Sequence, residues 1–302
     1  MALTKQSIMD ISRLSASRYR NMAGTLCIND DVIMLEKTHS LFNRNITFQL
    51  NHVCAALIRK GSADFLVDGT EYHVKKNDLF VIIQQQEVRK INQSDDFEAH
   101  VLLMSREYID ALNISNAVQL FLRVQRDPII HLKGVDFGVY LNCFNMIIST
   151  LHHTNNPFQE QIVRHLIKAY MYRLAYNLRL NNYTPQSREE DVCLRFIRLL
   201  EQYYKEQHSV SFYAKKMNLT ARYVSSCVKT ITSKTAIATI NEMLLQHAQQ
   251  ALKERNKTIS EISYELGFTN PSVFGKFFRT HMQIGPREWR ENNRESSANG
   301  II

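Results

Sequence analysis

The 302-residue sequence predicts an α+β protein in which a small β-barrel with flanking helices precedes an all-helical domain. Short β-rich runs separated by turn residues occupy residues 38–103, whereas residues 137–180 and 188–292 carry apolar residues at helical spacing. A helix, turn, helix pattern also occurs twice near the C-terminal end. The length agrees with two domains, because each part is long enough to bury its own core.

The β-rich part consists of runs at 53–58, 64–67, 71–74, 79–83 and 98–103. Asp68-Gly69 joins two of these runs, and this dipeptide is a strong signal for a tight hairpin. Several short strands at such spacing indicate a sandwich or a barrel.

The repeated pattern begins at Ser209 and again at Thr258. Both residues suit a helix N-cap, and Thr258 with Glu261 forms a capping box. Asn218 and Gly267 follow the last apolar position of each helix, and these residue types tolerate the left-handed conformation that ends helices. The sequence therefore predicts two equivalent helix-turn-helix units, at 209–231 and 258–281.

A second helix is expected after each turn, over 220–231 and over 270–281, where Asn270 is the N-cap and Pro271 the first helical residue. Spacing places one set of residues inward: Val224, Cys227, Val228, Phe274, Phe277 and Phe278. The outward set is Arg222, Ser225, Ser226, Lys229, Ser272, Val273, Gly275, Lys276 and Arg279. Short polar residues with a few long cations suit a helix in the DNA major groove. The alternative is a pair of helical hairpins with solvated outer faces.

Residues 235–254 predict one long helix between the two units. Twenty residues span about 30 Å, close to the roughly 34 Å between successive major-groove faces of B-DNA. One chain could therefore read two adjacent groove segments.

These residues resemble a known family. Gly267-Phe268, Phe274, Phe277-Phe278-Arg279, Ile284-Gly285-Pro286 and Arg290 are similar to the second half of the AraC/XylS DNA-binding domain, and the resemblance covers 188–292. Carried over by position, it implies base contacts from Arg222, Ser225, Ser226, Ser272, Val273 and Lys276. We expect phosphate contacts from Thr220, Lys229, Lys234, Asn270, Arg279 and Arg287.

The sequence departs from the family pattern at four positions. The family usually has Gly where Gln283 stands, Thr where Gly285 stands, an aromatic residue at Val228, and a Gly near Ser233. We expect an altered final turn before Pro286 and a looser first unit.

The β-rich part resembles the family's cupin-like regulatory domain in its pattern and position. The expected layout is a regulatory and dimerisation domain at 1–182, with the barrel at about 30–105 and helices at about 106–182. A linker at 183–188, a DNA-binding domain at 189–292 and a tail at 293–302 complete the chain.

The positive charge is concentrated in the repeated part. Residues 205–290 hold 13 Lys and Arg against 6 Asp and Glu, and so account for +7 of the formal net charge of +8. A basic balance suits nucleic acid, although it would equally suit an anionic membrane surface. RNA is less expected, because the stacking aromatics and glycine loops of common RNA-binding modules do not occur.

An enzymatic barrel is the competing interpretation, namely a cupin-type isomerase or dioxygenase with a helical accessory domain. Metal-dependent cupins need several converging N/O ligands, but no His-x-His pair occurs in the sequence. His39, His52, His73 and His100 are isolated, and His152-His153 suits a helix end. We therefore expect no enzyme activity, metal or cofactor. A helical scaffold that binds only proteins is a third possibility.

Residues 163–178 carry an amphipathic helical stripe that could pair with a second copy in a homodimer. The residues assigned to dimerisation are Val163, Leu166, Ile167, Tyr170 and Leu174. Five scattered cysteines and the lack of a signal peptide or long apolar run favour a cytoplasmic protein without membrane contact.

The sequence thus predicts a transcription regulator that binds double-stranded promoter DNA through two recognition helices. The resemblance implies a homodimer, with a small-molecule effector in the barrel and RNA polymerase as further possible partners.

Overall fold

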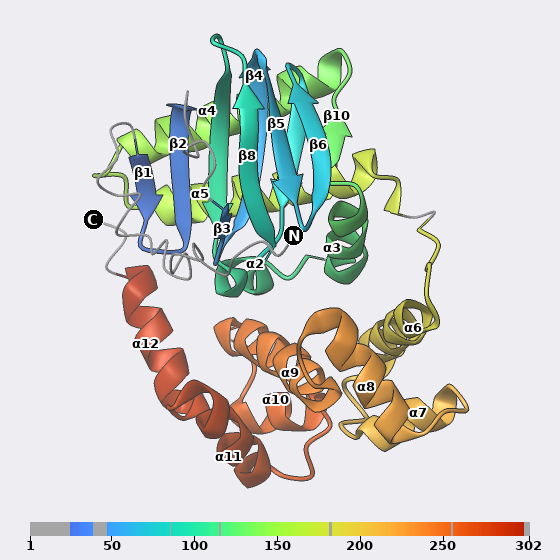
Figure 1. Cartoon of the computed structure of the whole chain (residues 1–302). Helices are drawn as coiled ribbons and strands as arrows, with labels where there is room; N and C mark the ends of the chain where they lie inside the picture. Colours follow the sequence, from blue (N-terminus) through green and yellow to red (C-terminus); the bar gives the residue numbers. More distant parts are fainter. Residues whose placement is uncertain are drawn as a thin grey trace. The chain divides into compact units, whose positions relative to one another are not determined.

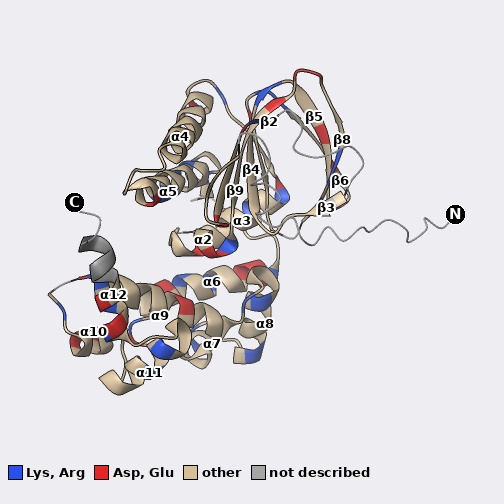
Figure 2. Cartoon of the chain, turned by 90° about the vertical axis from the view of Figure 1, so that its left-hand side faces the viewer, with Lys and Arg blue, Asp and Glu red and all other residues tan. Residues whose placement is uncertain are grey.

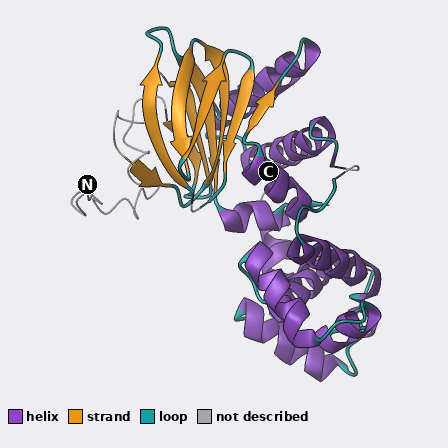
Figure 3. Cartoon of the chain, turned by 45° about the vertical axis from the view of Figure 1, so that its right-hand side comes forward, coloured by secondary structure: helices purple, strands orange, loops and turns teal. Residues whose placement is uncertain are grey.

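The computed structural model describes residues 25–38, 47–84, 86–114, 116–180, 183–254 and 256–298 (Figure 1). His39 and Arg255 lie outside these residues. The chain forms two compact units that divide between Tyr183 and Thr184. The described strands all belong to the first unit, and the second is helical (Figure 3). The predicted α+β fold class is confirmed.

The first unit contains two antiparallel sheets. The larger has the order β1-β2-β9-β4-β7-β10, and the smaller has the order β3-β8-β5-β6. The strand bounds are β1 Thr25–Ile28, β2 Val32–Thr38, β3 Thr47–Gln49, β4 Val53–Lys60, β5 Ser62–Val67, β6 Thr70–Lys75, β7 Asp78–Ile82, β8 Glu87–Gln93, β9 Glu98–Met104 and β10 Ile129–His131.

The expected barrel is a two-sheet sandwich. Within the described part of the chain, no strand of one sheet pairs with a strand of the other. Closure of a barrel requires its edge strands to pair, and alternation along each strand does not determine this. The sequence signal for either architecture is the same.

The central strands of the larger sheet are buried on both faces. In β4, Val53 and Ala55 face the helices, whereas Cys54 and Ala56 face the smaller sheet. A strand that is covered on both sides shows a continuous apolar run, as observed. The first unit therefore has three layers: the small sheet, the large sheet and a layer of helices.

The hairpin predicted at Asp68-Gly69 is confirmed. Val67 of β5 pairs with Thr70 of β6, and both turn residues have positive φ, 48° at Asp68 and 82° at Gly69. Two central residues with positive φ characterise the type I′ turn, whose twist matches that of the flanking strands.

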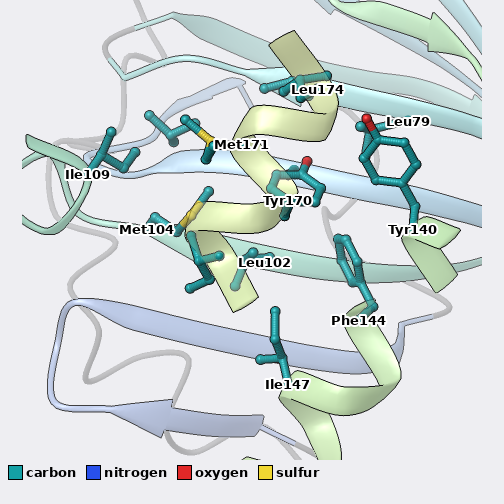
Figure 4. Packing of buried hydrophobic residues seen from close by; sticks show 14 of the residues in the cluster. Leu79, Leu102, Met104, Ile109, Tyr140, Phe144, Ile147, Tyr170, Met171 and Leu174 are labelled. Carbon is teal, nitrogen blue, oxygen red and sulfur yellow. The ribbon is translucent and has the colours of Figure 1, made fainter. Parts of the chain in front are cut away.

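Among the described residues, the first unit contains four helices: α2 Arg106–Ala111, α3 Ala117–Arg126, α4 Val135–His152 and α5 Gln159–Asn177. Figure 4 shows the contact of α4 and α5 with the large sheet, where Tyr140 and Phe144 of α4 meet Tyr170 of α5. The Tyr170 ring lies edge-on to both, with centroids 5.4 Å and 5.9 Å away.

This packing covers the residues that were expected to mediate dimerisation. Val163, Ile167, Tyr170 and Leu174 are at most 2% exposed, and Leu166 packs against the same cluster. Within one chain, the apolar stripe of α5 is covered by its own sheet. Amphipathicity shows that a face is buried without showing what buries it.

The second unit consists of seven helices among the described residues: α6 Arg188–Tyr203, α7 Val210–Lys216, α8 Ala221–Thr232, α9 Ala236–Lys253, α10 Ile259–Glu265, α11 Pro271–Met282 and α12 Pro286–Ala298. Helix α8 packs on α6, α7 and α9, whereas α11 packs on α10 and α12. The long helix predicted at 235–254 is α9, with Thr235 as its N-cap.

No helix within the described residues has both the length and the apolar character required to cross a bilayer.

Candidate nucleic-acid interface

The first helix-turn-helix unit is α7, a tight turn and α8. Ser209 caps α7 by accepting a hydrogen bond from the Phe212 amide, and Thr220 caps α8 by accepting one from the Tyr223 amide at 3.2 Å. Val224, Cys227 and Val228 are at most 1% exposed, so this face of α8 fills the core as predicted. The opposite face is left to solvent.

The second helix-turn-helix unit, which consists of α10 and α11, repeats this construction. Thr258 and Glu261 form the predicted capping box, and the Asn270 side chain accepts a hydrogen bond from the Val273 amide at 3.0 Å. Phe274 and Phe278 are fully buried, and Phe277 packs against the same cluster. Both α8 and α11 thus begin at a capped N-terminus and expose one polar face.

The turns adopt the backbone conformation that the sequence requires. Asn218 has φ 56° and Gly267 has φ 74°, which confirms both as left-handed ends of the first helices. Ser233 and Gln283, where the family usually has Gly, also take positive φ, 59° and 64°. The departures from the family pattern therefore leave these turns left-handed.

The residues expected to contact bases lie on α8 and α11. Five of them are exposed, and Ser225 is half-buried: Arg222, Ser226, Ser272, Val273 and Lys276 form the exposed group. Val273 is 47% exposed although it is apolar. An exposed aliphatic side chain among polar ones can contact a thymine methyl group in the major groove.

The six residues expected to contact phosphate differ in their surroundings. Lys229 and Arg279 are exposed and, within the described residues, form no ion pair. Lys234 donates to Glu242 Oε2 at 2.8 Å, and Arg287 Nε lies 3.2 Å from Glu291 Oε1. Thr220 and Asn270 already use their side chains as caps. The structure therefore separates two available cations from two that have carboxylate partners.

Charge is distributed unevenly over these helices. Helices α8 and α11 contain Lys and Arg and no acidic residue, whereas α10 contains Glu261 and Glu265 (Figure 2). A basic recognition helix attracts the phosphate backbone, and an acidic one repels it.

Sequence reasoning did not identify one feature beside α8. An open groove of about 640 Å³ is lined by Arg188, Asn218, Leu219, Thr220 and Tyr223. The Arg188 guanidinium lies over the Tyr223 ring, 5.9 Å from its centroid. Arg188 is the first residue of α6, more than 30 positions from Tyr223, and no local pattern connects them.

The histidines of the β-rich part have other partners. His52 Nε2 lies 2.8 Å from the Asp30 carbonyl oxygen, and His73 Nδ1 lies 2.6 Å from Asp64 Oδ1. His100 is 1% exposed, and burial lowers its pKa from 6.5 to about 4. Among the described residues, no group of three or more His, Cys, Asp or Glu side chains could hold a metal ion.

Two capped helix pairs, each with an exposed basic helix, define a DNA-binding protein of the helix-turn-helix class. A helix-turn-helix domain family model matches residues 213–292. The lactose operon transcription activator of Staphylococcus xylosus is 22% identical over 244 residues, 78% of this chain and 82% of the relative. The transcriptional activator RhaR of Salmonella dublin is 18% identical over 244 residues, 80% of this chain and 85% of the relative.

Among solved structures, apo ToxT from Vibrio cholerae is similar over 87% of this chain and 97% of its own, with 14% identity and a TM-score of 0.35. The family model and the sequence relatives agree with the motif at 267–290. Together these findings support an AraC/XylS-family transcription regulator. The chain is a DNA-binding transcriptional regulator.

Proposed function

We propose that α8 and α11 are the two recognition helices of this regulator and that they enter successive major-groove segments of one promoter site. The observation that carries the proposal is the matched exposure of Arg222, Lys229, Lys276 and Arg279 on two capped helices whose opposite faces are buried. Lys276 and Arg222 are assigned to base edges. Lys229 and Arg279 are assigned to phosphates.

The test begins with selection of duplexes from a random DNA pool by the full chain, because the enriched duplexes reveal the site directly. Lys276→Ala is expected to weaken binding to the selected duplex by about 1 to 3 kcal/mol and to relax preference at one position. Lys257→Ala is the matched control, because Lys257 pairs with Glu254 and Glu265 on the acidic side of the unit. Equal losses in the two variants, or none, would contradict the assignment.

The competing enzyme hypothesis has a direct test. Metal analysis of the purified full chain should find no stoichiometric iron, manganese or zinc. A tightly held metal in a one-to-one ratio would favour the cupin-type isomerase or dioxygenase. Salt-dependent retention of duplex DNA separates the regulator from a helical scaffold that binds only proteins.

We assign dimerisation to the outer face of α4, where the fold leaves several apolar side chains uncovered. Val135, Val139 and Met146 are 81%, 40% and 54% exposed, and Asn142 is exposed between them. Their spacing of four, three and four residues forms a coiled-coil seam, and one Asn within such a seam favours a defined pair. We assign the homodimer contact to this seam.

The test is sedimentation equilibrium of the full chain. Val139→Glu is expected to give a monomer, because it places a charge in the seam. Gln161→Glu, an exposed position on α5, is expected to leave the association unchanged. A monomeric wild-type protein, or a dimer that is insensitive to Val139→Glu, would refute this contact.

Effector control would require a second arrangement of the first unit. The cavity between the sheets, lined by Phe65, Phe80 and Lys90, measures about 10 Å³, and the one between sheet and helices about 20 Å³. Each holds about one water. A ligand can shift the unit only toward a form that binds it better, so we assign effector control to an expanded sandwich. Thermal unfolding of the full chain against a metabolite panel tests this.

We propose that the regulator activates transcription, because the relatives from Staphylococcus xylosus and Salmonella dublin are both named as activators. We assign it to contact between the DNA-bound protein and RNA polymerase. Transcription from a selected site with purified polymerase tests this. An unchanged transcript level on addition of the protein would contradict activation.

A further inference from the structure

The turn between α6 and α7 lies against the turn of the second helix-turn-helix unit. His208 Nε2 is 2.9 Å from the carbonyl oxygen of Leu266, and the His208 ring packs on Phe268 with centroids 5.0 Å apart. A carbonyl oxygen can only accept, so Nε2 carries the proton and donates. His208, which lies just before the N-cap of α7, thus binds the turn that precedes α11.

Gly267 allows this close approach. A Cβ atom on Gly267 would overlap the carbonyl oxygen of Lys205, so no other residue type fits without movement of the backbone. Asn218 occupies the equivalent turn position in the first unit, with φ 56° against 74°. The difference between Asn and Gly therefore follows the neighbouring backbone as well as the left-handed conformation.

The turn between α6 and α7 is also fixed to the first helix-turn-helix unit. Tyr213, on α7, is fully buried and donates from its hydroxyl to the Gln207 carbonyl oxygen at 2.6 Å. Its ring lies edge-on to Phe196 of α6 at 5.4 Å. The α6–α7 turn is thus not a free loop, because a core side chain of the first unit holds its backbone.

A second contact joins the turn to α9. The Tyr204 ring stacks on His247 with centroids 4.1 Å apart and planes inclined by 16°, and Tyr204 packs against the core cluster of the second unit. Burial lowers the pKa of both His208 and His247. Burial in this site thus favours the neutral form of both rings.

We propose that Tyr204, His208 and Gly267 form a clamp that fixes α11 relative to α8 and thereby sets the spacing of the two DNA segments that one chain can read. The inference rests on the proposed recognition helices. His208 and Tyr204 are positioning residues that need not touch DNA.

The clamp supplements α9, which alone connects the units along the chain. Helix α9 packs on α8 and on α10, and the contacts between the turns add a second link between the two helix-turn-helix units. If the two recognition helices are already ordered relative to each other before binding, the entropy cost of ordering them on DNA is avoided. The clamp is present without DNA, and it raises affinity only for a duplex that both helices engage.

The test uses two duplexes and the full chain. One duplex is selected from a random pool by the wild-type protein, and the other is the same duplex with one half-site scrambled. His208→Ala is expected to lower affinity for the intact duplex by about 10-fold and to change affinity for the scrambled one by less than about 2-fold. His208→Gln, which keeps a donor near Leu266, should restore part of the difference.

Gly267→Ala and Asn218→Ala form a matched pair. Both place alanine at a left-handed turn position, but only Gly267→Ala meets the Lys205 carbonyl. Gly267→Ala should therefore reproduce the selective loss on the intact duplex, and Asn218→Ala should not. Equal losses on the two duplexes, or none, in both His208→Ala and Gly267→Ala would overturn the clamp.

A DNA-free measurement separates this inference from the proposed function. Amide hydrogen exchange of the unliganded chain should be faster over residues 259–268 in His208→Ala than in wild type, because the turn loses its support. Unchanged exchange there would also overturn the clamp. Failure of the wild-type protein to select any duplex would instead refute the recognition helices.

Discussion

Lys229→Ala is expected to flatten the salt dependence of DNA binding. Lys229 is exposed in the last turn of α8, and no described carboxylate pairs with it. Lys234, five residues later, donates to Glu242 at 2.8 Å. Both were expected from the sequence to contact phosphate, so the pair tests whether an existing ion pair removes a cation from the interface.

The magnitude follows from counterion release. Each phosphate contact contributes about 0.9 to the slope of log affinity against log salt. A fourfold rise in salt, from about 50 mM to about 200 mM, therefore weakens one contact by about 3.5-fold. Lys229→Ala should lose this factor, so its deficit relative to wild type should be about 3.5 times larger at the lower salt.

Fluorescence anisotropy of a labelled, selected duplex at five or six salt concentrations measures the slope. Lys234→Ala should change the slope less, because Glu242 already neutralises part of that charge. Lys257→Ala, also paired with carboxylates, should leave it unchanged. Parallel lines for wild type and Lys229→Ala would refute the phosphate assignment. A larger change in Lys234→Ala would refute the reasoning from ion pairs.

Three further predictions concern stability. Phe278→Ala should lower the free energy of unfolding of the helical unit, residues 184–302, by about 3 to 5 kcal/mol in urea titrations, since Phe278 is fully buried against Trp289; an unchanged urea midpoint for this unit would contradict it. Asn270→Ala should cost about 1 kcal/mol by removing the α11 cap, and an unchanged urea midpoint would contradict the capping role. Burial, and then the charge of Arg59, lower the pKa of His100 to about 4, so the unfolded chain binds the proton first and stability should fall by about 3 kcal/mol as pH drops from 6.5 to 4. Urea unfolding of wild type and His100→Gln at both ends of that range measures this contribution, and equal pH dependence in the two would refute it.

Local features were predictable from the sequence because their causes are local. Ser209, Thr220, Thr258 and Asn270 cap helices through hydrogen bonds to amides three residues away. The Asp68-Gly69 turn depends on two adjacent residues. Helical periodicity likewise identified the buried faces of α8 and α11, since the period shows which side is apolar.

Long-range partners were not predictable in this way. Leu166 and Ile167 form a stripe that suits a dimer as well as a sheet, and only the fold shows that the stripe of α5 faces its own sheet. Lys234 and Glu242 pair across the start of α9, at a separation that no helix rule covers. His208 and Leu266 are 58 positions apart, so their contact depends on the arrangement of both units.

The departures from the family pattern have a local explanation. Ser233 takes a left-handed conformation that is usual for Gly, and the chain closes around it because Thr232 Oγ1 donates to the Val228 carbonyl at 2.8 Å and accepts from the Lys234 amide at 3.2 Å. These bonds occupy backbone groups that a helix end otherwise leaves unpaired.

The second helix-turn-helix unit stabilises its left-handed position at the end of α11 in a different way. Gln283 is left-handed, and its own side-chain amide donates to the Thr280 carbonyl at 3.3 Å. A Cβ on Gly285 would lie 3.3 Å from the Arg279 guanidinium, so the larger Thr of the family would press on that side chain. Glycine at 285 therefore leaves Arg279 room beside the turn. Arg279 is the side chain that we assign to a DNA phosphate. The family departure at Gly285 therefore keeps the proposed phosphate contact free to move.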